Sequence, residues 1–440
     1  MNHFRLIPLS LALAAALALP ARAQSLVDLY ESARGFDASY QSARLLYQAN
    51  LARAEQARAA ILPSASLALG LNRANVGSDV SALDRGSYGN LGATVSASQP
   101  LYRPANVASA EQGKKQVALA QAQLTAAEQD LIVRVSQAYF DVLAAKDNLN
   151  FVKAQKNAVS EQLASAKRNF EVGTSTITDT REAQARFDLV LAQEIAAEND
   201  LLVKRIALDQ LTGKTDALPK PLSVPVTIPV LLPADVNQWV AQSEEAHPGI
   251  RQARVGLEVA ELETEKARAG HKPTLDLTGS YGVTQNNGSS STTLDYRTDV
   301  ATIGLAFNLP IFSGFATQNR IKETLALEEK SRSDLEGARR AVAQATRTAF
   351  FGVQSGLGQV KALEAAEASS QSALDATRLG YQVGVRINID VLNSQSILFD
   401  TKARLAKARY DVLLGALKLR QANGTLTSDD MQGLNATLAN

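Results

Sequence analysis

Apolar residues recur at every seventh position along a stretch without internal proline, residues 105–171. The repeat occupies these positions: Val117, Leu124, Leu131, Ala138, Ala145, Val152, Val159 and Ala166. A sustained seven-residue repeat winds helices around one another in a left-handed supercoil. At about 1.5 Å per residue, one helix over this stretch would be roughly 100 Å long, which no globular core accommodates. We therefore expect it to pack side by side with helices of similar length.

Two other regions alternate apolar and small or polar residues with a period of two. The apolar positions are Leu67, Leu69 and Leu71 in the first region, and Ile303, Leu305, Phe307 and Leu309 in the second. This pattern is typical of a strand with lipid on one side and water on the other, although a half-buried hairpin of a soluble protein would also show it. The segments 72–87 and 285–297 are rich in Gly, Ser, Asn and Asp, which predicts hairpin loops.

The two halves of the chain repeat one another. The same spacing separates Pro63 from Pro273 and Pro100 from Pro310, and nearly the same spacing separates Gly213 from Gly424. We expect two copies, 24–213 and 234–424, each ordered as helix, two strands, long helix, turn and helix. The first helices are expected at 27–61 and 234–270. The segment 214–233 between the copies is dense in proline, which predicts an extended linker, and 425–440 is a C-terminal tail.

Glycine marks the reversal that follows each long helix. The pairs Val172-Gly173 and Val383-Gly384 predict its end, because glycine readily adopts the left-handed conformation that terminates helices. A returning helix should start near Asp179 in the first copy and near Asp390 in the second. Asp179 has Glu182 three residues later, as in a capping box, so helix capping is one role open to it.

Residues 1–23 have the features of a secretory signal peptide. Arg5 precedes an apolar run, 6–19, and Ala21-Arg22-Ala23 resembles a cleavage site. The run is shorter than the roughly 20 residues that a membrane-spanning helix requires. We therefore expect the mature chain to begin near Gln24, outside the cytoplasm.

Composition excludes several functional classes. The 440 residues include no cysteine, and the net charge is +1, which argues against disulfides, thiolate chemistry and a nucleic-acid partner. Three isolated histidines, His3, His247 and His271, are a poor basis for a metal site or a catalytic triad. The sequence Gly213-Lys214-Thr215 lacks the upstream glycine of a phosphate-binding loop. We expect no catalytic residue, cofactor or metal, and hence no enzyme.

Four predicted strands per chain are too few for a membrane barrel, since the smallest natural ones have about eight. Open strand edges are not tolerated in lipid, so several chains would have to share one barrel. Two chains would supply eight strands and three would supply twelve, wide enough for a water-filled lumen. These arguments permit a trimer without selecting it.

The segment 381–393, YQVGVRINIDVLN, and the closing stretches 408–414 and 423–426 closely resemble the TolC family of outer-membrane channels. The resemblance covers essentially the whole mature chain. It implies an α+β membrane protein, a homotrimer whose 12-stranded β-barrel lies in outer-membrane lipid and continues as a 12-helix coiled tunnel across the periplasm. It also implies a passive exit duct that docks on a periplasmic adaptor (membrane fusion protein) and an inner-membrane transporter. Type I protein secretion and drug efflux are the implied functions, and the side chains do not indicate the cargo.

The resemblance also implies a periplasmic gate at the turns of the helical hairpins. The matching positions are Thr178, Asp179, Tyr381, Arg386, Asp390 and Asn393. The first four match residues that link neighbouring coils, and Asp390 matches an acidic ring at the constriction. Asn393 stands where the family pattern has a second aspartate, so one ring of three carboxylates is expected instead of two.

A soluble periplasmic coiled-coil adaptor or scaffold is the alternative function. An adaptor would show one helical hairpin flanked by β-rich halves and a membrane anchor. This sequence instead predicts two equivalent hairpins, two pairs of strands and no anchor, which favours the channel.

Overall fold

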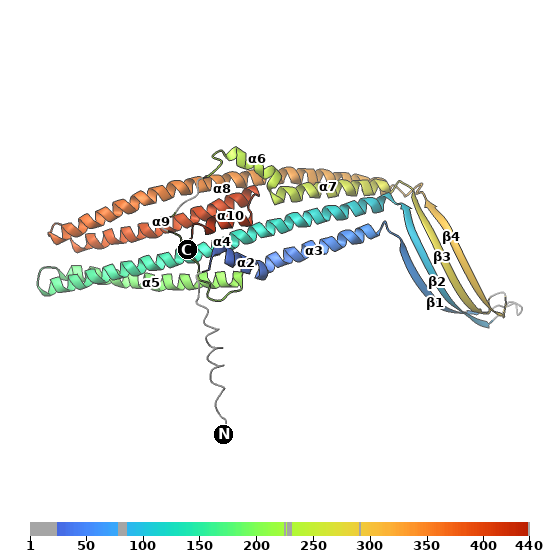
Figure 1. The fold of residues 1–440 in the computed structure, drawn as a ribbon, viewed down its shortest axis with the longest axis horizontal. Helices are drawn as coiled ribbons and strands as arrows, with labels where there is room; N and C mark the ends of the chain where they lie inside the picture. The colour runs from blue at the N-terminus through green and yellow to red at the C-terminus, as the bar shows by residue number, and fades with distance from the viewer. Residues whose placement is uncertain (1–23, 78–85, 224–225, 227–230, 290–291, 439–440) are drawn as a thin grey trace, which may run out of the picture. The chain divides into compact units, whose positions relative to one another are not determined.

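The computed structural model describes residues 24–77, 86–223, 226, 231–289 and 292–438, so the predicted signal peptide 1–23 and parts of both strand loops lie outside the described residues. Thirteen elements follow one another along these residues (Figure 1): α2 (Leu26–Phe36), α3 (Ala38–Ala59), β1 (Ser64–Val76), β2 (Gly86–Tyr102), α4 (Pro104–Glu171), α5 (Ile177–Thr212), α6 (Val236–Ala246), α7 (Pro248–Ala269), β3 (Thr274–Asn287), β4 (Asp295–Asn308), α8 (Ala316–Gln382), α9 (Asn388–Asn423) and α10 (Ser428–Asn435). The predicted long helices and four strands are confirmed.

The chain divides into two compact units. Of the described residues, unit 1 contains those up to Ser42, those within Thr125–Pro248 and those from Arg340 onward, and unit 2 contains those within Ala43–Leu124 and Gly249–Arg339. The long helices α4 and α8 contribute residues to both units. Among the described helices, none is both long enough and apolar enough to cross a bilayer.

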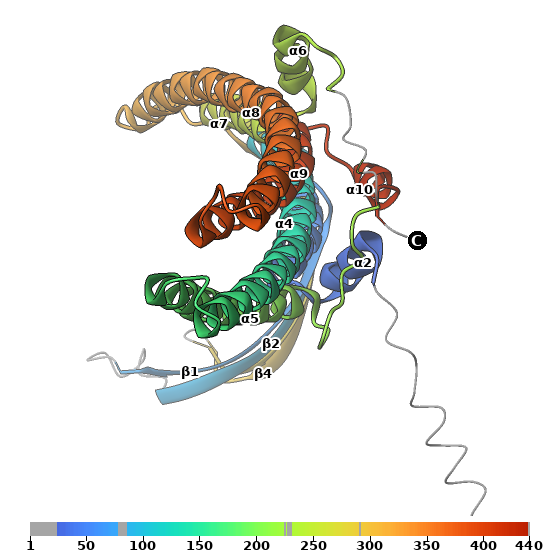
Figure 2. The same cartoon turned by 90° about the vertical axis from the view of Figure 1, so that its left-hand side faces the viewer.

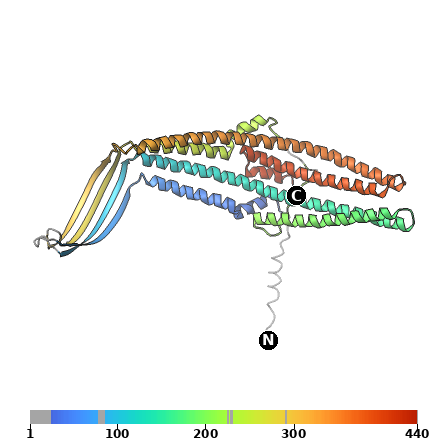
Figure 3. The same cartoon turned by 180° about the vertical axis from the view of Figure 1, so that it is seen from behind.

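Unit 2 holds one antiparallel sheet in the order β1-β2-β3-β4 (Figure 3). Directly paired residues of an antiparallel sheet share a face, so the registers assign each side chain to one of two faces. One face is largely apolar and carries Leu67, Leu69, Leu71, Val95, Tyr281, Leu277, Ile303, Leu305 and Phe307, with the charged residues Arg73, Arg297 and Asp299 toward the hairpin loops. The opposite face carries small and hydroxyl side chains: Ser66, Ser96, Ser98, Thr94, Thr278, Ser280, Gly282, Thr302 and Gly304. The sheet therefore has one apolar face and one face of small and hydroxyl side chains, here called the wettable face. β1 and β4 are its edge strands.

An ion pair joins the sheet to the helix that follows β2. The Arg103 guanidinium, directly before α4, donates from Nε and Nη2 to the two carboxylate oxygens of Asp276 on β3, at 2.8 and 2.5 Å. The Asp276 side chain is largely buried. A bidentate pair of this kind is directional, so it fixes where α4 leaves the sheet.

In unit 1 most of the predicted heptad positions of α4 are buried, although Ala138 and Val152 are only half-buried and Phe170 is exposed. Leu131, Ala145, Val159 and Ala166 are almost completely covered, as are Val135, Val142 and Leu163 between them. The shorter helices α2 and α10 lie side by side in this unit (Figure 2), where the Leu26 amide donates to Asn435 Oδ1 at 3.2 Å. The predicted tail, 425–440, thus contains a helix.

The first helix of each copy is interrupted, whereas the sequence pattern predicted one continuous helix. In the first copy, Asp37 Oδ1 accepts from the Tyr40 amide at 2.8 Å, which caps α3 and ends α2. Arg134 of α4 donates to both oxygens of the same carboxylate, at 2.8 and 3.0 Å, and holds the pKa of Asp37 below its usual range. In the second copy Pro248 opens α7, where its missing amide proton costs nothing.

Helices α5 and α9 end at glycines, as predicted. Gly213 and Gly424 have φ angles of 69° and 81°, the left-handed conformation. Gly424 is also crowded, because a Cβ atom there would lie 2.3 Å from the Cα of His247 and 2.6 Å from its nitrogen. The Gln129 side chain of α4 donates to the carbonyls of Gly424 and Leu426, at 3.0 and 3.1 Å. This glycine therefore allows several segments of unit 1 to meet.

Candidate functional site: the hairpin turns

The predicted gate residues lie around two helix reversals in unit 1, the α4–α5 turn and the α8–α9 turn. Gly173 and Gly384 adopt φ angles of 75° and 78°. At the first turn the Thr174 amide donates to the Asn169 carbonyl at 2.8 Å, and at the second the Val385 amide donates to the Gly380 carbonyl at 2.9 Å. The same local geometry thus closes both hairpins.

Asp179 is a capping residue, but not with the partner that the sequence suggested. The N-cap of α5 is Thr176, and Asp179 occupies the third helical position of the capping box. The Asp179 carboxylate accepts from the Thr176 amide at 2.9 Å and from the Ser175 hydroxyl at 2.7 Å. The Ser175 hydroxyl is the main reason why the pKa of Asp179 is lowered. Glu182 takes no part in this box, while Thr178 is exposed beside it.

Asp390 occupies a different environment at the start of α9. The N-cap of that helix is Ile387, which makes no side-chain capping bond, so the carboxylate is not used in a capping box. Arg386 Nη1 lies 3.6 Å from Asp390 Oδ2, and both side chains are substantially exposed. An exposed pair with this spacing contributes only about 0–1 kcal/mol. Within one chain, Arg386 is therefore loosely held.

The other two predicted residues connect the hairpins to each other. Tyr381 at the end of α8 accepts a hydrogen bond from the Asn169 side chain at the end of α4, at 3.3 Å. Asn393 Oδ1 on α9 accepts from Arg186 Nη2 on α5, at 2.7 Å. The amide that replaces the family's second aspartate is therefore bound to a guanidinium group of the other hairpin.

Sequence reasoning missed a deeply buried polar residue of this region, Asn388, which is 2% exposed. Its side chain accepts a hydrogen bond from the Gln162 side chain of α4 and donates to the Asp179 carbonyl at 3.4 Å. Asn388 lies between Ile387 and Ile389, and the polar residues around it show no periodicity that would predict its burial. Its partners are distant in sequence, so no local signal indicated them.

We refer to these three links as the hairpin clamp: Gln162–Asn388–Asp179, Asn169–Tyr381 and Arg186–Asn393. An apolar cluster lies with it, formed by Val159, Leu163 and Ala166 of α4, Ala183 and Val190 of α5, and Leu392 of α9. Burial of this cluster brings α9 against the first hairpin. The polar links then fix the relative register of the two hairpins, because hydrogen bonds are directional.

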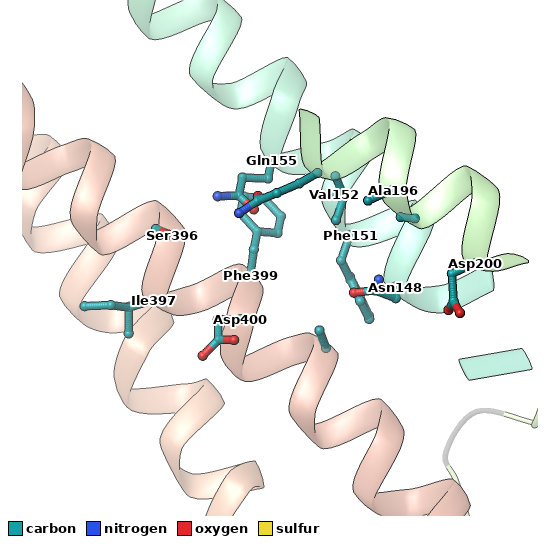
Figure 4. A pocket seen from close by; sticks show the side chains of 13 residues that line it. Asn148, Phe151, Val152, Gln155, Ala196, Asp200, Ser396, Ile397, Phe399 and Asp400 are labelled. Atoms are coloured by element: carbon teal, nitrogen blue, oxygen red, sulfur yellow. The ribbon is translucent and has the colours of Figure 1, made fainter. Parts of the chain in front are cut away.

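A groove of about 610 Å³ lies further along the same helices (Figure 4). Its lining includes Phe151 of α4 and Ile397 and Phe399 of α9, with Asp200 of α5 and Asp400 of α9 among its polar residues. It thus offers an apolar surface with carboxylates beside it. In the part of the chain that the structure describes, no three His, Asp or Glu side chains gather as metal ligands would.

Comparison with known proteins shows which family model, relatives and solved structures this chain is similar to. The family model described as outer membrane efflux protein matches residues 29–214 and 239–425. The outer membrane protein TolC of Vibrio cholerae is 34% identical over 420 residues, 94% of this chain and 94% of that protein. The alkaline protease secretion protein AprF of Pseudomonas aeruginosa is 31% identical, covering 93% and 86%. The solved structure of the outer membrane protein VceC of Vibrio cholerae superposes with a TM-score of 0.76 at 20% identity, covering 92% and 97%.

Proposed function

This chain belongs to the outer membrane efflux protein family, and on that premise we propose that it is a passive exit duct of the TolC type. The family and the outer-membrane location that the sequence predicted are confirmed. One observation carries the proposal: a sheet with an apolar and a wettable face, and two edge strands, is joined to coiled-coil helices far too long for a globular core. The alternative of a soluble periplasmic adaptor or scaffold conflicts with the outer-membrane location.

Self-association would complete the sheet. Open strand edges are not tolerated in lipid, and a chain brings only four strands. Pairing of β1 of one copy with β4 of the next removes every edge when the ring closes. We propose a homotrimer with a 12-stranded barrel in outer-membrane lipid, because three copies supply twelve strands and a water-filled lumen.

Complementary helix surfaces in unit 1 support the same ring. Helix α5 exposes a stripe of large apolar side chains, Leu191, Ile195, Leu202 and Ile206. Helices α8 and α9 border a groove of about 750 Å³ that is lined largely by small residues, among them Ala345, Gly352, Ser355, Gly356 and Gly415. We propose that the stripe of one copy enters the groove of the next. Contacts between two different surfaces form a ring when the rotation from one copy to the next closes.

The energy for export would come from partners. We propose that the hairpin turns face a periplasmic adaptor (membrane fusion protein) that connects the duct to an inner-membrane transporter. The groove of Figure 4, with Asp200 and Asp400 beside its apolar surface, suits a helix that carries basic residues.

The name of the relative AprF refers to protease secretion. We propose type I protein secretion, drug efflux or both as the transport that the duct serves.

The hairpin turns would form the gate of this duct. We propose that Arg386, which is loosely held within its own chain, reaches Thr178 and Asp179 of the next copy. Tyr381 and Asn393 would hold the two hairpins of one chain together through the clamp. Asp390 would line the constriction as one ring of three carboxylates, because Asn393 is neutral.

Replacement of Arg386 by serine should loosen the entrance without affecting the fold. Among the described residues, the Arg386 side chain pairs only with Asp390, and only weakly, so the apparent melting temperature should stay close to that of the wild type. We expect a higher single-channel conductance in planar bilayers. R404S is the matched control, since Arg404 pairs with Asp400 within one exposed turn of the same helix. Equal conductance of R386S and R404S would contradict the assignment of Arg386 to the gate.

The exit duct itself is tested with the purified mature protein. We expect discrete conductance steps in planar bilayers, and a band of three chains on an unheated gel that collapses to one chain after heating. A monomer that conducts no ions and fractionates with soluble periplasmic proteins would overturn the proposal.

A further inference from the structure

A pocket of about 320 Å³ lies in unit 1, lined by α9, α10 and the segment that leads into α6. Figure 2 shows α6 and α10 beside α9. The floor of the pocket consists of large side chains that are almost completely buried: Trp239, Val353, Val412, Leu417, Leu419 and Leu434. A concave, mostly apolar pocket of this size is the usual form of a site for a small organic molecule.

Small residues keep this pocket open. Ala416 of α9 and Gly433 of α10 both line it. A Cβ atom at Gly433 would meet nothing within 4 Å, so the open space reaches the backbone of α10. Apolar side chains at such a surface gain contacts and lose exposure to water when a solute of matching shape covers them. The floor therefore favours an apolar body.

The rim of the pocket carries one uncompensated charge. Asp430 in α10 pairs with Arg420 of α9, and its carboxylate also accepts from the Thr427 amide at 2.9 Å. These two opposite charges neutralise each other. Asp429 also lines the pocket and is exposed. Among the described residues, no side chain forms an ion pair or hydrogen bond with the Asp429 carboxylate. An apolar floor thus lies beside a single free negative charge.

We propose that this pocket binds a small amphipathic organic cation, a compact apolar body that carries one ammonium group. The apolar body covers Trp239 and its neighbours, while the ammonium group contacts the Asp429 carboxylate and stays partly hydrated. An anion is disfavoured, because Asp429 repels it and Arg420 is already held by Asp430. The inference uses no contact between copies, and it does not rest on the proposed exit duct.

The pocket contains its own reporter. Trp239 is the only tryptophan of the chain, and its Nε1 donates to the Pro233 carbonyl at 2.9 Å, which holds the indole in the pocket wall. Adamantylamine is a suitable probe, since it is compact, cationic and transparent where tryptophan is excited. Titrated into the mature protein in detergent micelles, it should change the Trp239 emission saturably, and calorimetry should give the same half-saturation. Adamantanol, its neutral counterpart, should bind roughly threefold to fivefold more weakly, as the loss of an exposed charge pair predicts. Adamantanecarboxylate should bind more weakly still.

Two substitutions with matched controls locate the site. D429N removes the free charge, so it should bind the amine no better than the alcohol, whereas D375N, at an exposed carboxylate of α8, should keep the preference. G433L places a side chain in the pocket and should abolish the saturable response, which leaves only partition of the probe into micelles. G337L is its control, because a Cβ atom at this glycine of α8 also meets nothing within 4 Å. It should bind like the wild type.

Each contrary outcome is distinct. Equal binding of the amine, the alcohol and the carboxylate to the wild type overturns the assignment of a cation. A saturable response that persists in G433L places the binding elsewhere and overturns the pocket, as does the lack of a saturable response by both methods. Loss of the heat-sensitive assembled band in G433L but not in G337L assigns the pocket to a contact between copies and overturns the ligand. Conductance enters none of these measurements, so failure of the exit duct is seen separately.

Discussion

Replacement of Gly424 by alanine is expected to prevent most of the chain from reaching its folded, assembled state. Two costs add at this position. The left-handed backbone, with a φ of 81°, costs a residue with a Cβ atom about 1–2 kcal/mol. The added methyl group would also lie 2.3 Å from the backbone of His247, and forced overpacking costs roughly 1–3 kcal/mol more. The measurements are the yield of the heat-sensitive assembled band and the apparent melting temperature from the helical circular dichroism signal.

Gly384 provides the matched control for this experiment. Its φ of 78° is almost the same, but a Cβ atom there would meet nothing within 4 Å. G384A should therefore lose only the roughly 1–2 kcal/mol of stability that the left-handed backbone conformation costs a residue with a Cβ atom. We expect it to assemble. Equal losses in G424A and G384A would show that the close approach to His247 does not matter.

Loss of two of the three links of the hairpin clamp is expected to produce the largest increase in conductance. The double substitution N388A/N393A removes the links from α9 to Gln162, to the Asp179 carbonyl and to Arg186. At about 1 kcal/mol net per hydrogen bond, the closed arrangement of each chain would lose roughly 2–3 kcal/mol. This is more than the weak pair of Arg386 supplies, so the conductance should exceed that of R386S. Single-channel recordings of the three proteins provide the comparison.

D400A is the control for the clamp in bilayers that contain no adaptor, because Asp400 pairs with Arg404 of its own helix and, among the described residues, with no side chain of the other hairpin. It should conduct like the wild type. If N388A/N393A keeps its assembled band and also conducts like the wild type, then the two hairpins of one chain do not need these links to stay closed. In that case the contacts between copies would have to hold the entrance alone.

The features predicted correctly from sequence are those whose cause is local or periodic. The heptad of α4, the alternation in β4 and the glycines at the ends of α5 and α9 each follow from the geometry of a single element. Asp179 shows the limit of such reasoning. Its capping role was foreseen, but the box forms with Thr176, because the backbone begins to coil three residues earlier than the carboxylate suggested.

The features that were missed depend on partners far away in the chain. The Asp37 carboxylate, at the interruption between α2 and α3, is stabilised by Arg134, which lies in another helix. Asn388 is buried because α9 packs on the first hairpin, and Gln162 is there to satisfy it. A burial that depends on tertiary packing has no periodic signature, so neither contact was visible in the order of residues alone.

The wettable face of the sheet has a consequence for cargo. Its hydroxyl and glycine positions carry almost no formal charge, and Asp276, which also points to this side, is neutralised by Arg103. Hydroxyl groups both donate and accept hydrogen bonds with water, and they carry no net charge that would favour one sign of ion over the other. A polypeptide or small molecule sliding past such a wall would meet a uniformly hydrated, non-adhesive surface. Cargo of any charge could then move through this section at similar speed, and discrimination would be exercised upstream, where cargo is loaded.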